Sequence, residues 1–98
     1  MTVRKPGRSG TTRVRFSLPA EVQADRVTVC GDFNEWSTTS HPLRHYKDGH
    51  FDVTIDLTDG TDYQYRFLLD GSRWENDWAA DAYAPNAYGG EDSVIRVE

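Results

Sequence analysis

The sequence predicts an all-β protein with the architecture of an immunoglobulin-like β-sandwich. Apolar and polar residues alternate with period two in several short segments, which is the pattern of half-buried strands. Asp-Gly pairs at 48–49, 59–60 and 70–71 favour tight turns between such strands. Aromatic residues make up 12% of the chain and no segment has the periodicity of an amphipathic helix, so a thin two-layer β protein is favoured over a helical bundle.

The predicted strands follow one another at short intervals. In the clearest of them every second residue from Phe51 to Leu57 is apolar, and the residues between are polar. A short segment around Leu43 and Tyr46 is also expected to pair. In chain order, the predicted strands are 13–18, 26–30, 51–57, 63–69, 73–75 and 93–97.

Two segments, one predicted strand and one predicted loop, bear on function. In strand 63–69 the row from Tyr63 to Leu69 is expected to face the core, which leaves Gln64, Arg66 and Leu68 on the opposite face. Residues 76–92 are expected to be irregular, and so long a loop in a small domain is typical of a functional segment.

The charge distribution divides the chain into two parts. Five of the eleven Lys and Arg residues lie in the first fifteen residues, whereas all sixteen Asp and Glu residues lie beyond them. Residues 1–12, which also hold Pro6 and two glycines, are therefore predicted to be a flexible basic arm before a domain at 13–98. The acidic domain argues against nucleic acid as a partner, because phosphate contacts need clustered basic side chains.

Composition and motifs also argue against several other functions. Cys30 is the single cysteine, so no internal disulfide is expected, and no apolar run reaches the roughly 20 residues that span a membrane. We expect a cytoplasmic protein without a membrane partner. No nucleophile elbow, phosphate-binding loop or metal-ligand spacing is present, and the three histidines are not at ligand spacing. The chain is therefore expected to have no enzymatic activity, no metal and no cofactor.

The three tryptophans are the main candidates for binding, because none lies in a predicted core row. Trp36 follows the turn after strand 26–30, where it is either a lid over the core or a platform for a ligand. At least one tryptophan is expected to be exposed, and an exposed ring often marks a recognition surface. Trp78 is expected to pack under the long loop. A sugar ring suits a flat indole with a polar rim, and Asn34, Arg66 and Asp92 are candidates for that rim.

Three motifs in order resemble one known family. They are Gly-Asp-Phe-Asn-Glu-Trp at 31–36, Tyr-Arg-Phe-Leu-Leu-Asp-Gly at 65–71 with Trp74, and Asn-Ala-Tyr-Gly-Gly-Glu-Asp-Ser-Val at 86–94. Over roughly residues 12 to 98 the chain is similar to the glycogen-binding domain, carbohydrate-binding module family 48. That domain occurs in the AMP-activated protein kinase β subunit and as the early-set N-terminal domain of branching and debranching enzymes. The resemblance implies an early-set, immunoglobulin-like sandwich that binds α-1,4-glucans such as glycogen, starch or maltooligosaccharides.

The resemblance also implies roles for individual residues. Trp36 and Trp74 match the tryptophans that stack on glucose, although the turn before Trp74 is one residue longer than in the kinase subunit. Arg66 matches a lysine that hydrogen-bonds sugar hydroxyls. Tyr88 stands where the kinase subunit has a leucine against the glucan, and Asp92 stands where the family often has asparagine. Each assignment has an alternative that needs no ligand. Trp36 could be a lid of the loop, Tyr88 could pack, and Arg66 and Asp92 could be plain surface residues. For Asn34 the alternative is a cap or brace for the loop.

Two functions follow from these observations. The first is a non-catalytic α-glucan-binding module whose partner is glycogen or a maltooligosaccharide. The alternative is a structural or protein-interaction domain with weak or no sugar binding. It would act in trans on a glycogen-metabolising enzyme or a kinase.

Overall fold

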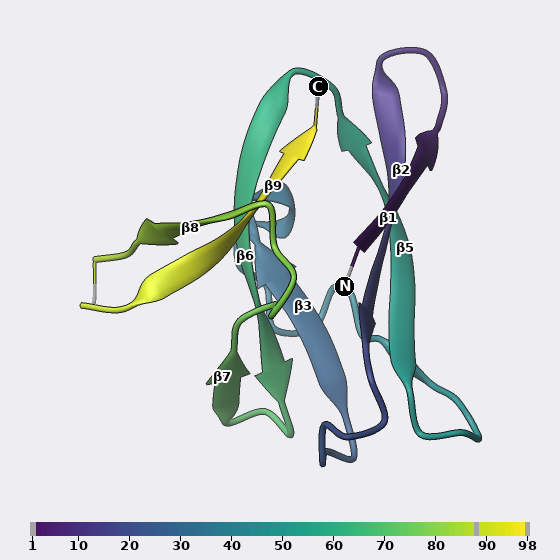
Figure 1. Ribbon diagram of the computed structural model, residues 1–98, viewed down its shortest axis with the longest axis vertical. Coiled ribbons are helices and arrows are strands. Elements are labelled where there is room, and N and C mark those ends of the chain that lie inside the picture. The colour runs from purple at the N-terminus through teal and green to yellow at the C-terminus, as the bar shows by residue number, and fades with distance from the viewer. Residues whose placement is uncertain (1, 88, 98) are drawn as a thin grey trace.

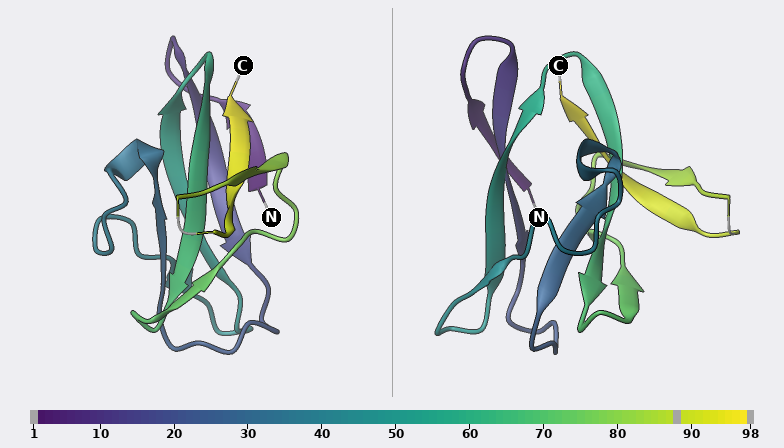
Figure 2. Two further views of the ribbon diagram at one scale, coloured as in Figure 1. Left: turned by 90° about the vertical axis from the view of Figure 1, so that its left-hand side faces the viewer. Right: turned by 180° about the vertical axis from the view of Figure 1, so that it is seen from behind.

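The computed structural model describes residues 2–87 and 89–97, and these form a sandwich of two antiparallel sheets (Figure 1, Figure 2). The first sheet has the strand order β1 (Thr2–Pro6), β2 (Thr11–Leu18), β5 (Phe51–Thr58), β4 (Arg44–His45). The second has the order β3 (Val27–Gly31), β6 (Thr61–Leu69), β9 (Glu91–Val97), β8 (Ala82–Pro85), and β7 (Arg73–Glu75) also pairs with β6. A 3₁₀ turn, η1 (Asp32–Asn34), follows β3. The predicted fold class is confirmed.

The core lies between the facing rows of the two sheets. Val14, Phe16 and Leu18 of β2 are buried on one side, and Tyr65, Phe67 and Leu69 of β6 are buried on the other. The rings of Phe16 and Tyr65 meet edge to face, with 5.0 Å between centroids. Period-two alternation thus supplies the core as predicted, and each buried large apolar side chain contributes about 1.5–3 kcal/mol.

A buried carboxylate closes one edge of the sandwich. The Tyr65 hydroxyl donates to Asp77 Oδ2 at 2.7 Å, and the Asp77 amide donates to Ser93 Oγ at 2.8 Å. Burial, reinforced by the Asp77 carboxylate, raises the pKa of Tyr65, so its hydroxyl remains a donor. These bonds draw Asp77 inward and leave Trp78 67% exposed. The expectation that Trp78 packs under the loop is wrong, because its neighbour takes the inward position.

Residues 2–6 form a strand, which differs from the flexible arm expected for residues 1–12. Strand β1 pairs with β2 from Thr2 opposite Phe16 to Pro6 opposite Thr12. The turn between them closes with a 2.8 Å bond from the Thr11 amide to the Arg8 carbonyl, and Gly10 takes a φ of 83° that favours glycine.

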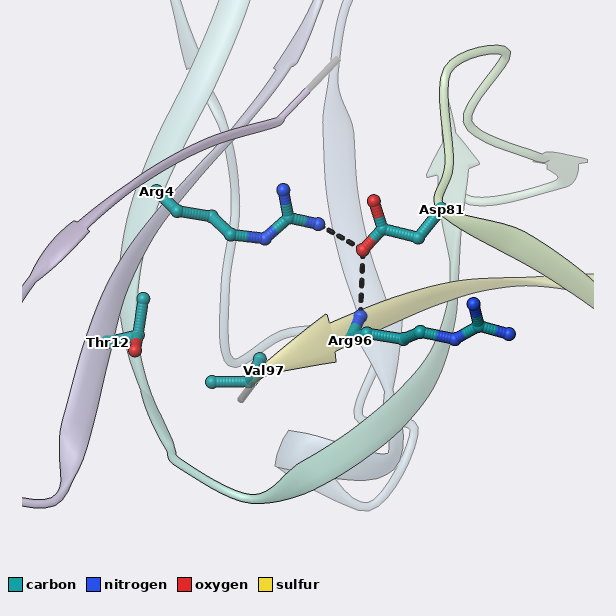
Figure 3. Close-up of a pocket in the computed structure, with 5 residues that line it drawn as sticks. All are labelled: Arg4, Thr12, Asp81, Arg96 and Val97. Carbon is teal, nitrogen blue, oxygen red and sulfur yellow. Dashed lines mark hydrogen bonds and ion pairs between the residues drawn. The ribbon is translucent and has the colours of Figure 1, made fainter.

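Strand β1 also contacts the second sheet. Arg4 forms an ion pair with Asp81, whose Oδ2 accepts the Arg96 amide at 2.8 Å (Figure 3). This ion pair links β1 to β9 across the sandwich edge, so pairing extends beyond the domain boundary predicted at residue 12.

The segment 76–92 is also more regular than expected. It contains β8, which pairs with β9 to form a hairpin that projects from the sandwich (Figure 1).

The predicted Asp70-Gly71 hairpin is confirmed, and both residues have positive φ, of 53° and 72°. Across the described residues, no helix is long and apolar enough to cross a membrane.

Strand β3 ends where the chain passes very close to β6. A Cβ on Gly31 would lie 2.6 Å from the Gln64 carbonyl oxygen and 2.7 Å from Tyr65 Cβ. Only glycine avoids this overlap, because the obstructing atoms belong to the backbone and core of β6.

Replacing Gly31 with alanine is therefore expected to lower the free energy of unfolding by about 1–3 kcal/mol through overpacking. Urea denaturation followed by circular dichroism measures this change. Gly90→Ala is the matched control, because its nearest neighbour would lie at an ordinary 3.5 Å. Equal stability of the two variants would contradict the close-approach explanation.

Candidate functional site

The outer face of the second sheet carries the polar and aromatic residues that the core does not use. On β6, Gln64 and Arg66 lie between the buried positions and therefore point outward. Trp74 of β7 pairs opposite Leu68, so it shares that outward face. On β9, Asp92 lies next to inward-facing Ser93, which pairs with Tyr65, so Asp92 faces the same way as Arg66. Strand pairing thus brings residues far apart in sequence onto one surface.

A cleft of about 870 Å³ lies on this surface. The residues that line it come from η1 and nearby Trp36, from β6 and β7, and from the β8–β9 hairpin. Of the predicted site residues, Trp36, Arg66, Trp74 and Asp92 line it, whereas Tyr88 lies outside the described residues. The lining residues are Asp32, Trp36, Gln64, Arg66, Trp74, Pro85, Asn86, Ala87 and Asp92.

Trp36 is held in place by the turn that leaves β3. Its amide donates to the Gly31 carbonyl at 2.9 Å, and both Glu35 and Trp36 have left-handed backbones, with φ of 55° and 58°. Each such residue costs about 1–2 kcal/mol, so the turn needs compensating contacts. One of these contacts is the 3.1 Å bond from the indole Nε1 to Asp32 Oδ1. Asp32 Oδ2 accepts a 2.9 Å hydrogen bond from the backbone N–H of Gln64, which fixes the turn to β6.

The two tryptophan rings form an angled pair. The centroids of Trp36 and Trp74 are 6.4 Å apart, and their planes meet at 62°. Trp74 is 41% exposed and Trp36 is half-buried. The expectation of at least one exposed tryptophan is confirmed. Trp36 lies beside the cleft and not within the core cluster, which favours a platform over a core lid.

Arg66 provides the positive charge in the cleft. Its guanidinium carbon lies 5.9 Å from the centroid of the Trp74 ring, within cation–π range. Its Nε is buried without a hydrogen-bond partner, and within residues 2–87 and 89–97 Arg66 forms no ion pair. The charge of Arg66 is therefore not neutralised by a neighbouring carboxylate.

Asp92 and Asn86 form the far wall of the cleft. Asp92 is only 6% exposed, and its Oδ1 accepts a 3.1 Å bond from Asn86 Nδ2. Asn86 Oδ1 in turn accepts the Gly90 amide at 3.1 Å, which closes the turn between β8 and β9. The structure thus places Asp92 deeper than the rim position expected for it, where it pairs with Ala84 of β8 and its carboxylate is bonded to Asn86.

Three polar residues of the cleft were not predicted as site residues: Asp32, Gln64 and Asn86. Gln64 shares the outward row with Arg66, so period-two alternation could have identified it. The contributions of Asp32 and Asn86 depend on turn geometry, which the sequence does not reveal. Asn34 does not line the cleft but braces the turn, as its alternative role required.

Two further features of this region are structural. Cys30 pairs opposite Arg66 on the outward face but is fully buried, and burial raises the pKa of its thiol, so the sulfur stays neutral. A smaller hollow of about 470 Å³ lies elsewhere, beside Arg4, Asp81 and Arg96 (Figure 3). Its Arg4 and Asp81 side chains are paired with each other, and none of the described residues that line it is aromatic, so it lacks the combination found in the larger cleft.

Comparison with known proteins identifies the family. Residues 3–84 match the family described as Carbohydrate-binding module 48 (Isoamylase N-terminal domain). The chain belongs to this family. Its members are carbohydrate-binding modules, in agreement with the resemblance carried by the three sequence motifs.

Two curated relatives are much longer proteins. The chain is 43% identical over 60 residues to a 1,4-alpha-glucan branching enzyme of Photobacterium profundum. It is 39% identical over 61 residues to a 1,4-alpha-glucan branching enzyme of Mesorhizobium japonicum. Each match covers 60% of this chain and 8% of the enzyme. The chain thus corresponds to a small part of these relatives.

Removing the Asp32 carboxylate is expected to free the Trp36 indole. In a Trp74→Phe/Trp78→Phe background, where Trp36 is the one tryptophan left to excite selectively, Asp32→Ala should shift the tryptophan emission to longer wavelength and increase its quenching by acrylamide. The physical reason is the loss of the bond from Nε1 and of the tether to β6. Glu35→Ala is the control, since Glu35 is an exposed acid in the same turn. Identical spectra for both variants would show that Asp32 does not hold the ring.

Proposed function

We propose that this chain is a non-catalytic module that binds α-1,4-linked glucans such as glycogen, starch and maltooligosaccharides. The observation that carries the proposal is the convergence of two angled indole rings with Arg66, Gln64, Asn86 and Asp92 around one cleft. The family provides independent support, because it is a family of carbohydrate-binding modules.

The lining groups suit the two sides of a glucose ring. One face of a pyranose carries C–H groups, which pack on the apolar face of Trp36 or Trp74. Its hydroxyls both donate and accept, so they need donors such as Arg66 and acceptors such as the side-chain oxygen of Gln64, both of which line the cleft. The carboxylates of Asp32 and Asp92 already accept hydrogen bonds from protein donors, and these bonds fix their orientation in the cleft before a sugar binds.

The angle between the rings favours an α-1,4-glucan over a flat β-1,4-glucan. Successive glucose units of an α-1,4 chain are rotated relative to one another because the chain coils, so two contacts at 62° match its curvature. A β-1,4 chain is extended and flat, and it would need nearly coplanar rings. The relatives support this choice, since both are 1,4-alpha-glucan branching enzymes.

The proposal predicts that both cleft tryptophans contribute to binding. Trp36→Ala and Trp74→Ala should each raise the Kd for maltoheptaose about 10- to 30-fold, which corresponds to about 1.4–2 kcal/mol of lost apolar burial. Isothermal titration calorimetry measures the Kd, and co-sedimentation with glycogen provides a second readout. Circular dichroism checks that each variant remains folded.

Trp78→Ala is the matched control, because Trp78 is the most exposed described tryptophan and does not line the cleft. It should bind maltoheptaose like the wild type, and cellohexaose should bind neither protein. Absence of heat and of fluorescence change with the wild type at millimolar maltoheptaose would contradict the proposal, as would equal losses in all three variants.

Docking onto a glycogen-metabolising enzyme is the second candidate function. It is favoured by one observation: the matching region makes up 8% of the branching enzymes, so related sequences occur within much longer proteins. A pull-down that recovers one stoichiometric enzyme, with no effect of added maltoheptaose, would support docking. Competition by maltoheptaose would instead assign the interaction to the glucan carried by that enzyme.

A further inference from the structure

We propose that neutral His41 is a positioning residue for the Trp36 platform and that its protonation weakens glucan binding. The inference rests on the proposed function of the cleft. His41 does not line the cleft, and its effect on Trp36 passes through the side chain of Asn34.

Two backbone contacts fix the orientation of the Asn34 amide. The Gly31 amide lies 3.1 Å from Asn34 Oδ1 and can only donate. The Val29 carbonyl lies 3.0 Å from Nδ2 and can only accept. Rotating the amide by 180° would place like groups together at both contacts, so the orientation with Nδ2 toward Val29 is the one that satisfies the backbone.

This orientation determines the state of His41. Asn34 Nδ2 also lies 2.9 Å from His41 Nδ1, and the only role left for Nδ2 is that of a donor. His41 Nδ1 must therefore accept, which requires a neutral ring with its proton on Nε2. A protonated His41 would direct an N–H from Nδ1 at the N–H of Asn34, and the contact would become repulsive.

The Trp36 turn depends on Asn34. Gly31 donates its amide to Asn34 Oδ1, and its carbonyl accepts the Trp36 amide at 2.9 Å. The Ser37 amide donates to the Asn34 carbonyl at 3.1 Å, so Asn34 contacts the turn on both sides of the ring-bearing residue. Glu35 and Trp36 between these contacts are both left-handed, a conformation that persists only while its surroundings enforce it. Loss of the Asn34 contacts would therefore allow the indole to leave its position.

The surroundings of His41 offer no other described partner for a charged ring. The Phe33 ring of η1 meets the His41 ring edge to face, with 6.0 Å between the ring centroids. In the part of the chain that the structure describes, His41 forms no ion pair. The charged groups of adjacent segments are engaged elsewhere or exposed. Asp32 holds Trp36 and Gln64, Glu35 is exposed, Arg44 of β4 lies over the Tyr46 ring, and Cys30 of β3 is a buried thiol.

Nuclear magnetic resonance tests the positioning without any ligand. A titration from pH 8 down to pH 5 follows the His41 ring nitrogens and the Trp36 indole Nε1–H together. The Trp36 signal should shift in the wild type in step with the protonation of His41 Nδ1, because that proton removes the acceptor of Asn34 Nδ2. In His41→Asn the amide oxygen can replace Nδ1 as an acceptor without titrating, so the Trp36 signal should stay fixed. The Trp78 indole signal is the internal control.

Calorimetry with maltoheptaose tests the effect on binding. From pH 8 to pH 5 the wild-type Kd should rise about tenfold, as expected when a donor loses its acceptor. His41→Asn should bind at both pH values like the wild type at pH 8, and His41→Leu should bind weakly at both. His45→Asn and His50→Asn are matched controls that remove the other two histidines, and both should keep the wild-type pH profile.

The two proposals fail in different ways. A wild type that binds maltoheptaose equally at pH 5 and pH 8, or a His41→Asn variant that keeps the pH dependence, would overturn the role of His41. A wild type that binds at neither pH would overturn the proposed function. In that case the indole signal still decides: a Trp36 resonance that does not respond to His41 would reject the positioning role as well.

Discussion

The structure depends on the register of β6, the strand that pairs with β3, β7 and β9. Its inward residues, Tyr65 among them, fill the core, and its outward residues Gln64 and Arg66 lie in the cleft. Because side chains alternate with period two, a shift of one residue would bury Arg66 and expose Tyr65. It would also separate the Tyr65 hydroxyl from Asp77, which closes the sandwich edge. One register therefore determines the core, the buried polar network and the floor of the site.

The close approach of Gly31 to β6 extends this register to the turn that carries Trp36. With no side chain at Gly31, β3 can end against the Gln64 carbonyl, and the next residue can reach the Gln64 amide with its carboxylate. The turn is therefore attached to β6 through the backbone of Gln64, which lies beside core Tyr65 and one outward position away from Arg66. The relative placement of Trp36 and Arg66 follows from the bond between the Asp32 carboxylate and the Gln64 backbone, and it does not need a direct contact between the two side chains.

The features that the sequence predicted correctly are those that a few neighbouring residues determine. The long strands and the cleft residues Trp36, Arg66 and Trp74 were identified because alternation and short motifs are visible within a few residues. Strand β1 was missed because its Arg4, Lys5 and Pro6 are the residues of an exposed edge, and such an edge carries no apolar signal. The expectation for Trp78 was wrong for a different reason. Hydrogen bonds to Tyr65 and Ser93, which are 12 and 16 residues away, hold its neighbour Asp77 inside, and Trp78 is exposed as a result.

The two rings of the cleft are held by different kinds of contact. Trp74 lies on β7, where backbone pairing with β6 fixes it in unstrained strand geometry. Trp36 lies on a strained turn whose position depends on side chains, chiefly those of Asp32 and Asn34. A platform fixed before the ligand arrives loses less conformational freedom on binding, so this strain is compatible with affinity. Backbone pairing does not depend on the protonation of a side chain, whereas a side-chain brace does, so solution conditions can move the Trp36 ring while Trp74 stays in place.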